Sequence, residues 1–179
     1  MKNNTNLLVH IALAIALSAV LNFLPLWQMP QGGKVSLEML PVLFIALKWG
    51  TVPGIITGLA YGFFQLMFDP HIIHPAQLIL DYPAAYLFLG LSGLFSKKIR
   101  SCRKKRLFYW MASAVLLGVL GRFFSHLFSG VIFFSHYAPE GQNVWIYSII
   151  YNASYLLPSM ILCYIVLIPL TNKLIREQM

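Results

Sequence analysis

The chain has 179 residues, of which 59% are hydrophobic and only 10% charged, and its mean hydropathy is +0.72. A soluble domain carries charge on about a quarter of its residues to cover an apolar core, so this composition excludes a soluble protein and predicts a polytopic membrane protein. The net charge of +8 does not indicate nucleic-acid binding, because seven of the thirteen Lys and Arg residues lie within residues 97–106, between two apolar segments.

Six apolar segments follow one another along the chain. They cover about residues 7–27, 38–49, 52–68, 76–96, 107–135 and 144–171. A helix of about 20 residues crosses the hydrocarbon core of a bilayer, and the first, fourth, fifth and sixth segments reach that length alone. The second and third are shorter and are separated by "KWGTVPG", where Pro53 favours the start of a new helix. We therefore predict a single all-α membrane domain, residues 1–179, of six transmembrane helices, with five as the alternative.

The first apolar segment follows a single lysine and resembles a signal peptide in outline. It is longer than a typical h-region and lacks a clear A-x-A cleavage site, so we expect it to be retained as the first membrane helix. Ala12 and Ala16 lie four residues apart on this segment. Such small-xxx-small spacing allows close packing of membrane helices, either within the bundle or against a partner protein.

The distribution of basic residues predicts the orientation of the chain, because Lys and Arg are retained in cytoplasmic loops. With both termini inside, eleven of the thirteen basic residues lie on the cytoplasmic side, including all seven in the predicted loop 97–106. Lys34 lies outside, and Arg122 lies within the membrane. The outer connections are rich in Pro, Gly and His and carry few charges, so we expect them to shape the mouth of a site.

The fifth segment carries two ionisable side chains inside the stretch "GRFFSHLFSGVIFF". Arg122, His126 and Gly130 fall at i, i+4 and i+8 and therefore share one face of a helix. Intramembrane ionisable residues face a bundle interior or a cavity. Arg122 lies too near the middle of the segment to reach the interface easily, so we expect a polar pocket, with simple pairing to a neighbouring helix as the alternative.

Asp81, near the outer end of the fourth segment, is the obvious counter-charge for Arg122. The residues alone leave three interpretations open: a salt bridge to Arg122, a charge close to a helix N-terminus that begins at Pro75, or a carboxylate that accepts hydrogen bonds from a ligand. Glu38 also lies in an apolar context. Its place at the start of the second segment favours a helix-terminal charge.

The sixth segment contributes "WIYSIIYNASYLLP". Tyr147, Tyr151 and Tyr155 form a stripe at i, i+4 and i+8, which is more typical of an interface belt or of helix packing than of a site. Asn152 differs, because its amide needs hydrogen-bond partners within a membrane and can both donate and accept. One acid, a cation, an imidazole, an amide and several aromatic rings can together hold a small, flat, polar molecule.

Other chemistries find little support in the sequence. Asp69, His71 and His74 match no tight metal-binding spacing, and Cys102 and Cys163 have no CxxC or Cys/His neighbour, so we expect no metal, no cofactor and free thiols. There is no HExxH, GxSxG or Walker motif, and we predict that the chain is not an enzyme. An intramembrane enzyme acting on lipid head groups would need a paired acidic motif such as DxxxD, and a purely structural membrane protein would need no polar cluster.

Four stretches resemble the thiamine-specific S component of energy-coupling factor transporters: "MPQGGKVSLEMLP", "LILDYPAAY", "GRFFSHLFSGVIFF" and "YAPEGQNVWIYSIIYNASYLLPS". The similarity extends over about residues 5–172. It implies a multi-pass protein of a bacterial cell membrane, with six helices, a thiamine site near the outer face and a loop after the first helix that closes over it. It also implies that this subunit only captures the vitamin, while transport needs a transmembrane scaffold protein and two ATPase subunits. The alternative is the same fold with another small vitamin or a pyrimidine precursor.

The resemblance assigns ligand-binding roles by position. The matching residues are Asp81, Tyr82, Arg122, His126, Gly130, Phe134, Tyr147 and Asn152. Asp81 corresponds to a carboxylate that binds the aminopyrimidine, and His126 to a histidine that packs on the ligand rings. Tyr82 and Phe134 would form aromatic walls, and Gly130 would let the ligand come close.

On the sixth helix, Tyr147 and Asn152 correspond to a hydrogen-bonding pair. Arg122 occupies a basic position that is lysine in some members. Because the thiazolium ring of thiamine is itself cationic, we expect Arg122 to fix Asp81 rather than to contact the cation.

The sequence departs from the family pattern in the carboxylate and at the mouth. Lys34 falls near a loop position where some members place a tryptophan lid, and His71 replaces a tyrosine. Asp81 is one methylene shorter than the glutamate found in other members. Lys34 and His71 are retained as predicted ligand-site residues. Ala12 and Ala16 match the small-residue pattern that the family uses against its scaffold.

Overall fold

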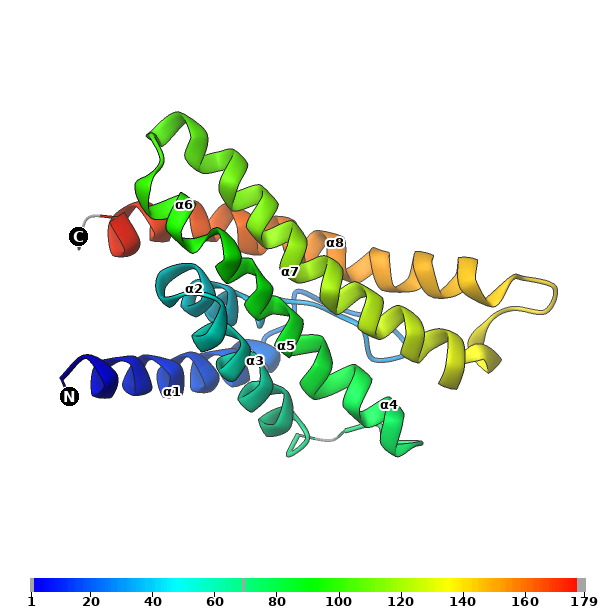
Figure 1. Cartoon of the computed structure of the whole chain (residues 1–179). Helices are drawn as coiled ribbons and strands as arrows, with labels where there is room; N and C mark the ends of the chain where they lie inside the picture. Colours follow the sequence, from blue (N-terminus) through cyan, green and yellow to red (C-terminus); the bar gives the residue numbers. More distant parts are fainter. Residues whose placement is uncertain (1, 69, 177–179) are drawn as a thin grey trace.

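The computed structural model describes residues 2–68 and 70–176, and this part of the chain is a bundle of six helical segments (Figure 1). In chain order they are α1 (Lys2–Asn22), α2 (Leu40–Trp49), α3 (Thr51–Gln65), a bent helix from Pro75 to Ser101, α7 (Lys104–Phe133) and α8 (Val144–Leu170). Four of them, α1, the bent helix, α7 and α8, are long and apolar enough to cross a bilayer. The predicted all-α membrane fold is therefore confirmed.

The short helix α2 forms the centre of the bundle. Its ten residues span about 15 Å at 1.5 Å per residue, which is about half the thickness of the hydrocarbon core. Seven of the ten are buried, and Leu43 and Leu47 belong to the main core cluster with Met111 on α7 and Leu156 on α8. Because α2 is apolar on all sides except at Lys48 in its last turn, it is stable only where other helices surround it.

The bent helix changes its winding where it carries Asp81. It consists of α4 (Pro75–Ile79), a π-helical turn η1 (Leu80–Ala84), α5 (Ala85–Leu89), a 3₁₀ stretch η2 (Gly90–Phe95) and α6 (Ser96–Ser101). Pro83 has no N–H to donate within η1, which interrupts the regular ladder. The hydroxyl of Ser125 on α7 donates a hydrogen bond of 2.6 Å to the Leu80 carbonyl oxygen, so a side chain of α7 binds the backbone of the bent helix at the π-helical turn.

Glycines at four-residue spacing let α3 pack directly on the bent helix. Gly54, Gly58 and Gly62 lie on one face of α3, and all three are buried. A Cβ atom at residue 58 would overlap the backbone carbonyl of Tyr86, and one at residue 62 would lie 2.6 Å from Cα of Pro83. Only glycine permits this approach, which is the general use of small residues between membrane helices.

Two predicted boundaries are wrong. The first helix ends at Asn22 rather than near residue 27, because Pro25 cannot continue it and Trp27–Gln28 (β1) pairs antiparallel with Lys34–Val35 (β2). The basic segment 97–106, predicted as a loop, is mostly helical, since α6 extends to Ser101 and α7 begins at Lys104. Lys and Arg are good helix formers, so charge alone did not indicate a loop.

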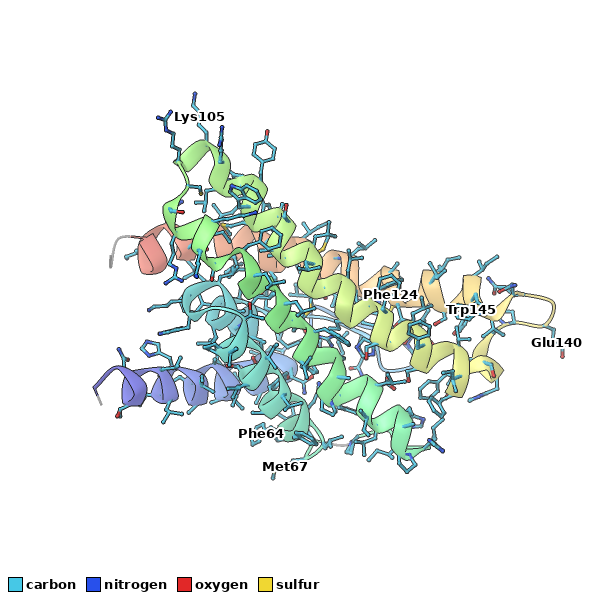
Figure 2. The ribbon with its side chains drawn as sticks, viewed as in Figure 1. Phe64, Met67, Lys105, Phe124, Glu140 and Trp145 are labelled. Carbon is cyan, nitrogen blue, oxygen red and sulfur yellow. The ribbon has the colours of Figure 1, made fainter. Side chains whose placement is uncertain are left out.

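The two ends of the bundle differ in charge. Figure 1 shows both termini and the turn between α6 and α7 at one end, with the loop between α7 and α8 at the opposite end. Lys105 projects from the first of these ends and Glu140 from the other (Figure 2). The basic end is the one that the distribution of Lys and Arg assigns to the cytoplasm. Phe124 and Trp145 point outward from α7 and α8, as expected for side chains that contact lipid.

We expect Gly58→Ala to lower the free energy of unfolding by about 1–3 kcal/mol, because the new methyl group forces α3 away from the bent helix. Unfolding of the detergent-solubilised protein measures this change. Ala112→Leu, on an exposed face of α7, adds more volume without a contact and is expected to change stability by less than about 0.5 kcal/mol. Equal effects of the two substitutions would contradict the packing argument.

Candidate ligand-binding site

A cavity of about 630 Å³ lies where the ends of α7 and α8, the bent helix and the β1–β2 turn meet. This volume is within the range of small-molecule sites. The cavity is lined by all ten residues that the sequence predicted for the ligand site: Lys34, His71, Asp81, Tyr82, Arg122, His126, Gly130, Phe134, Tyr147 and Asn152. Residues up to 118 positions apart in the chain therefore surround one space, while their individual contacts with a ligand remain predictions.

Asp81 presents its carboxylate in a fixed orientation. Oδ2 accepts hydrogen bonds from Nε2 of Gln77 at 2.7 Å and from Oγ of Ser129 at 2.8 Å. Oδ1 lies 3.1 Å from Nδ1 of His126. A carboxylate oxygen has two lone pairs, so Oδ1 retains the capacity to accept one more hydrogen bond from a molecule in the cavity.

Arg122 is paired with Glu38 and not with Asp81. Nη2 of Arg122 lies 2.8 Å from Oε1 of Glu38 and donates a second hydrogen bond of 3.0 Å to the Tyr86 hydroxyl. Both charged side chains are almost fully buried, at 7% and 5% exposure. Of the three interpretations that the sequence left open for Asp81, the salt bridge to Arg122 is therefore excluded, and the interpretation of Glu38 as a simple helix-terminal charge is wrong. Glu38 precedes α2 and reaches Arg122 because α2 lies at the centre of the bundle.

His126 connects these two groups. Its Nε2 lies 3.2 Å from Nε of Arg122, and a guanidinium nitrogen can only donate. Nε2 must therefore accept, which places the imidazole proton on Nδ1, where it is donated to Asp81. Arg122 thus acts on Asp81 only through a neutral histidine that it orients.

Helix α8 supplies a wall of aromatic and amide groups. The rings of Tyr147 and Tyr151 are stacked with centroids 6.0 Å apart, and the Tyr155 hydroxyl donates a 2.7 Å hydrogen bond to Oδ1 of Asn152. The amide of Asn152 also donates to the carbonyl oxygen of Ser148 at 2.9 Å. All three tyrosines of the stripe line the cavity, whereas the sequence favoured an interface belt or helix packing.

The mouth of the cavity is formed by elements from both halves of the chain. The ring of His71 is stacked on Phe134 at 5.9 Å. In the β1–β2 turn, the Gly33 N–H donates to the Tyr151 hydroxyl at 3.1 Å, and Nζ of Lys34 donates to Oδ1 of Asn22 at 3.2 Å. The turn is thereby held against α8 and α1.

Gly130 permits close contact of α7 and α8. A Cβ atom there would overlap the hydroxyl of Ser148 and would lie 3.6 Å from Nδ2 of Asn152. The missing side chain therefore brings the polar groups of the two helices to the same wall of the cavity.

Among residues 2–68 and 70–176, no group of three His, Cys, Asp or Glu side chains is arranged to hold a metal ion. His74 instead caps α4, where its Nδ1 accepts a hydrogen bond of 3.1 Å from the Ala76 N–H. Asp69, the third candidate in this segment, lies outside the described residues.

Residues 8–178 match the family model described as "Thiamine transporter protein (Thia_YuaJ)". The chain belongs to the thiamine transporter family. The thiamine transporter ThiT of Bacillus subtilis (strain 168) is 41% identical over 167 residues, covering 89% of this chain and 87% of that protein. ThiT of Lacticaseibacillus paracasei is 29% identical over 167 residues, covering 89% of this chain and 83% of that protein.

A solved structure of ThiT from Listeria monocytogenes has the same architecture. It matches with a TM-score of 0.88 at 29% identity, and the match covers 96% of both chains. Family membership and the four apolar helices confirm a multi-pass membrane transporter of the bacterial cell membrane, and not an enzyme.

Sequence reasoning missed several polar residues of the transporter's cavity. The sequence pattern placed Glu38 at a helix end and did not indicate Gln77 or Tyr86, which line the cavity, or Ser129, which donates to Asp81. A signal existed for Gln77, which lies four residues before Asp81 and therefore shares its helix face. No local pattern pointed to Tyr86, because its hydroxyl meets a partner 36 residues away.

We expect Arg122→Met to destabilise the transporter by about 3–5 kcal/mol, because it leaves the Glu38 carboxylate buried without its cation. The double variant Glu38→Gln/Arg122→Met should recover part of this loss, since both charges are removed. Unfolding of the ligand-free protein in detergent measures both values. Lys173→Met, at an exposed cation, serves as the control. Strictly additive losses in the double variant would argue against a coupled pair.

Proposed function

We propose that this chain binds thiamine in the cavity and serves as the substrate-capture subunit of an energy-coupling factor transporter. Its membership of the thiamine transporter family makes thiamine uptake its function. We infer that the cavity is the thiamine-binding site and that separate subunits provide the energy for transport.

The observation that carries the proposal is the Asp81 carboxylate, held at the cavity wall by three side-chain partners. Thiamine has a flat aminopyrimidine ring and a cationic thiazolium ring. We infer that Asp81 accepts a hydrogen bond from the exocyclic amino group, and that Tyr147 and Asn152 complete the contacts at the pyrimidine edge. Two carboxylates are among the described residues that line the cavity. Glu38 is paired with Arg122, so Asp81 is the one of these two that can interact with the ligand.

Aromatic faces would hold the rings of the ligand. Tyr82 and Phe134 line the cavity, and His126 is fixed between Arg122 and Asp81. Such faces attract flat and cationic groups. Lys34 and His71 at the mouth, and Gly130 in the wall, complete the proposed site. No metal or other cofactor is required for this mode of binding.

We expect Asp81→Asn to weaken thiamine binding by about 10- to 100-fold, because a charge-assisted hydrogen bond is lost. Calorimetric titration of the purified protein measures the affinity. Glu140→Gln, at an exposed acid in the α7–α8 loop (Figure 2), removes the same charge away from the cavity and should leave binding unchanged. Unchanged affinity in Asp81→Asn would refute the assigned role, and a wild-type protein that binds another vitamin and not thiamine would refute the proposal.

The exposed face of α1 supports the proposed assembly. Ala12 and Ala16 are both exposed and lie one turn apart, and small residues at this spacing allow a second helix to approach closely. We propose that this face contacts a transmembrane scaffold subunit, which couples the chain to two cytoplasmic ATPase subunits.

We expect Ala12→Leu/Ala16→Leu to abolish thiamine uptake by cells while leaving the affinity of the isolated subunit within about twofold, because the added side chains point away from the cavity. Uptake of labelled thiamine and titration of the purified variant measure the two quantities. Leu13→Ala, at a neighbouring exposed position, is the control. Uptake at the wild-type rate would exclude α1 as the scaffold contact.

A further inference from the structure

Gln77 is a buried polar residue whose side chain borders the cavity. It lies in α4, one helical turn before Asp81, and is 1% exposed. A buried amide must have its hydrogen-bond partners supplied by the protein. Those partners lie both in the site and in the outer segment 70–74, which precedes α4.

The three hydrogen bonds of Gln77 define a single orientation of its amide. Oε1 accepts from the Ile73 N–H at 3.2 Å, while Nε2 donates to the His71 carbonyl oxygen at 3.0 Å and to Oδ2 of Asp81 at 2.7 Å. A flipped amide would place two donors together at Ile73 and two acceptors together at His71 and at Asp81. Only an amide of this length satisfies all three neighbours at once.

Asp81 depends on such support because its position in the chain restrains it little. It lies in the π-helical turn η1, directly before Tyr82 and Pro83, where the regular backbone ladder is interrupted. Of its two carboxylate oxygens, Oδ2 is occupied by Gln77 and Ser129, so Oδ1 is the oxygen with capacity left toward the cavity. Gln77 therefore helps to determine which oxygen meets a ligand.

We propose that Gln77 is a positioning residue that orients the Asp81 carboxylate toward the amino group of the ligand and links this carboxylate to the outer segment 70–74. This inference rests on the proposed thiamine site. A residue that only anchored the segment 70–74 would change the affinity for all ligands equally, whereas a positioning residue changes the affinity for ligands that bind the Asp81 carboxylate.

The test compares thiamine with an analogue in which hydrogen replaces the exocyclic amino group of the pyrimidine. Gln77→Met keeps the length of the side chain and removes its hydrogen bonds. We expect it to weaken thiamine binding by about 10- to 100-fold and binding of the analogue by less than about threefold, because only thiamine uses the oriented oxygen. Gln77→Asn, one methylene shorter, should show the same selectivity, and Gln142→Leu, at an exposed loop glutamine, should bind both ligands as the wild type does.

A second measurement uses the Asp81→Asn background. There, Gln77→Met should weaken thiamine binding by less than about threefold further, because the group that it positions is already lost. An equal loss for thiamine and the analogue, or full additivity with Asp81→Asn, would show a purely structural role and overturn the inference. Failure of the wild-type protein to bind thiamine would instead overturn the proposed function.

Discussion

Polar groups that a helix carries into a bilayer must find their partners within the protein, because lipid supplies none. In this chain Arg122 makes such a demand, and its Nη2 donates to Glu38 and to Tyr86. Arg122 thereby connects three elements, since it lies on α7, Glu38 lies two residues before α2, and Tyr86 lies on α5. Glu38 and Arg122 both line the cavity. The loss of either residue would leave the other charge buried without its partner and would strongly destabilise the protein.

Hydrogen bonds continue from this pair to the outer surface. Arg122 orients His126, His126 donates to Asp81, and Asp81 accepts from Gln77, which holds the segment 70–74. Each group in this series has a defined donor or acceptor role, so the carboxylate is presented with little freedom. Preorganisation of this kind reduces the entropy lost when a ligand binds.

Backbone features bring these side chains within reach of one another. The glycines of α3 allow the bent helix to lie directly against it, and Gly130 allows α8 to approach α7. At the π-helical turn around Pro83, α7 contacts the bent helix twice: Ser125 donates to the Leu80 carbonyl oxygen, and Ser129 donates to the Asp81 carboxylate. The glycines and Pro83 thus help to form the site, because they determine how closely the helices that carry the polar residues approach one another.

The sequence by itself determined the membrane class, the six apolar segments, the basic end and the unusual polar residues within them. It also placed Arg122, His126 and Gly130 on one helix face, because helical periodicity is a local property. Only the tertiary structure decided that Glu38, 84 positions away, is the partner of Arg122, and that Gln77 supports Asp81. Two carboxylates in apolar segments, Asp81 and Glu38, were possible partners of Arg122. Helical periodicity indicates which residues share a helix face, but it does not indicate which faces of different helices are in contact.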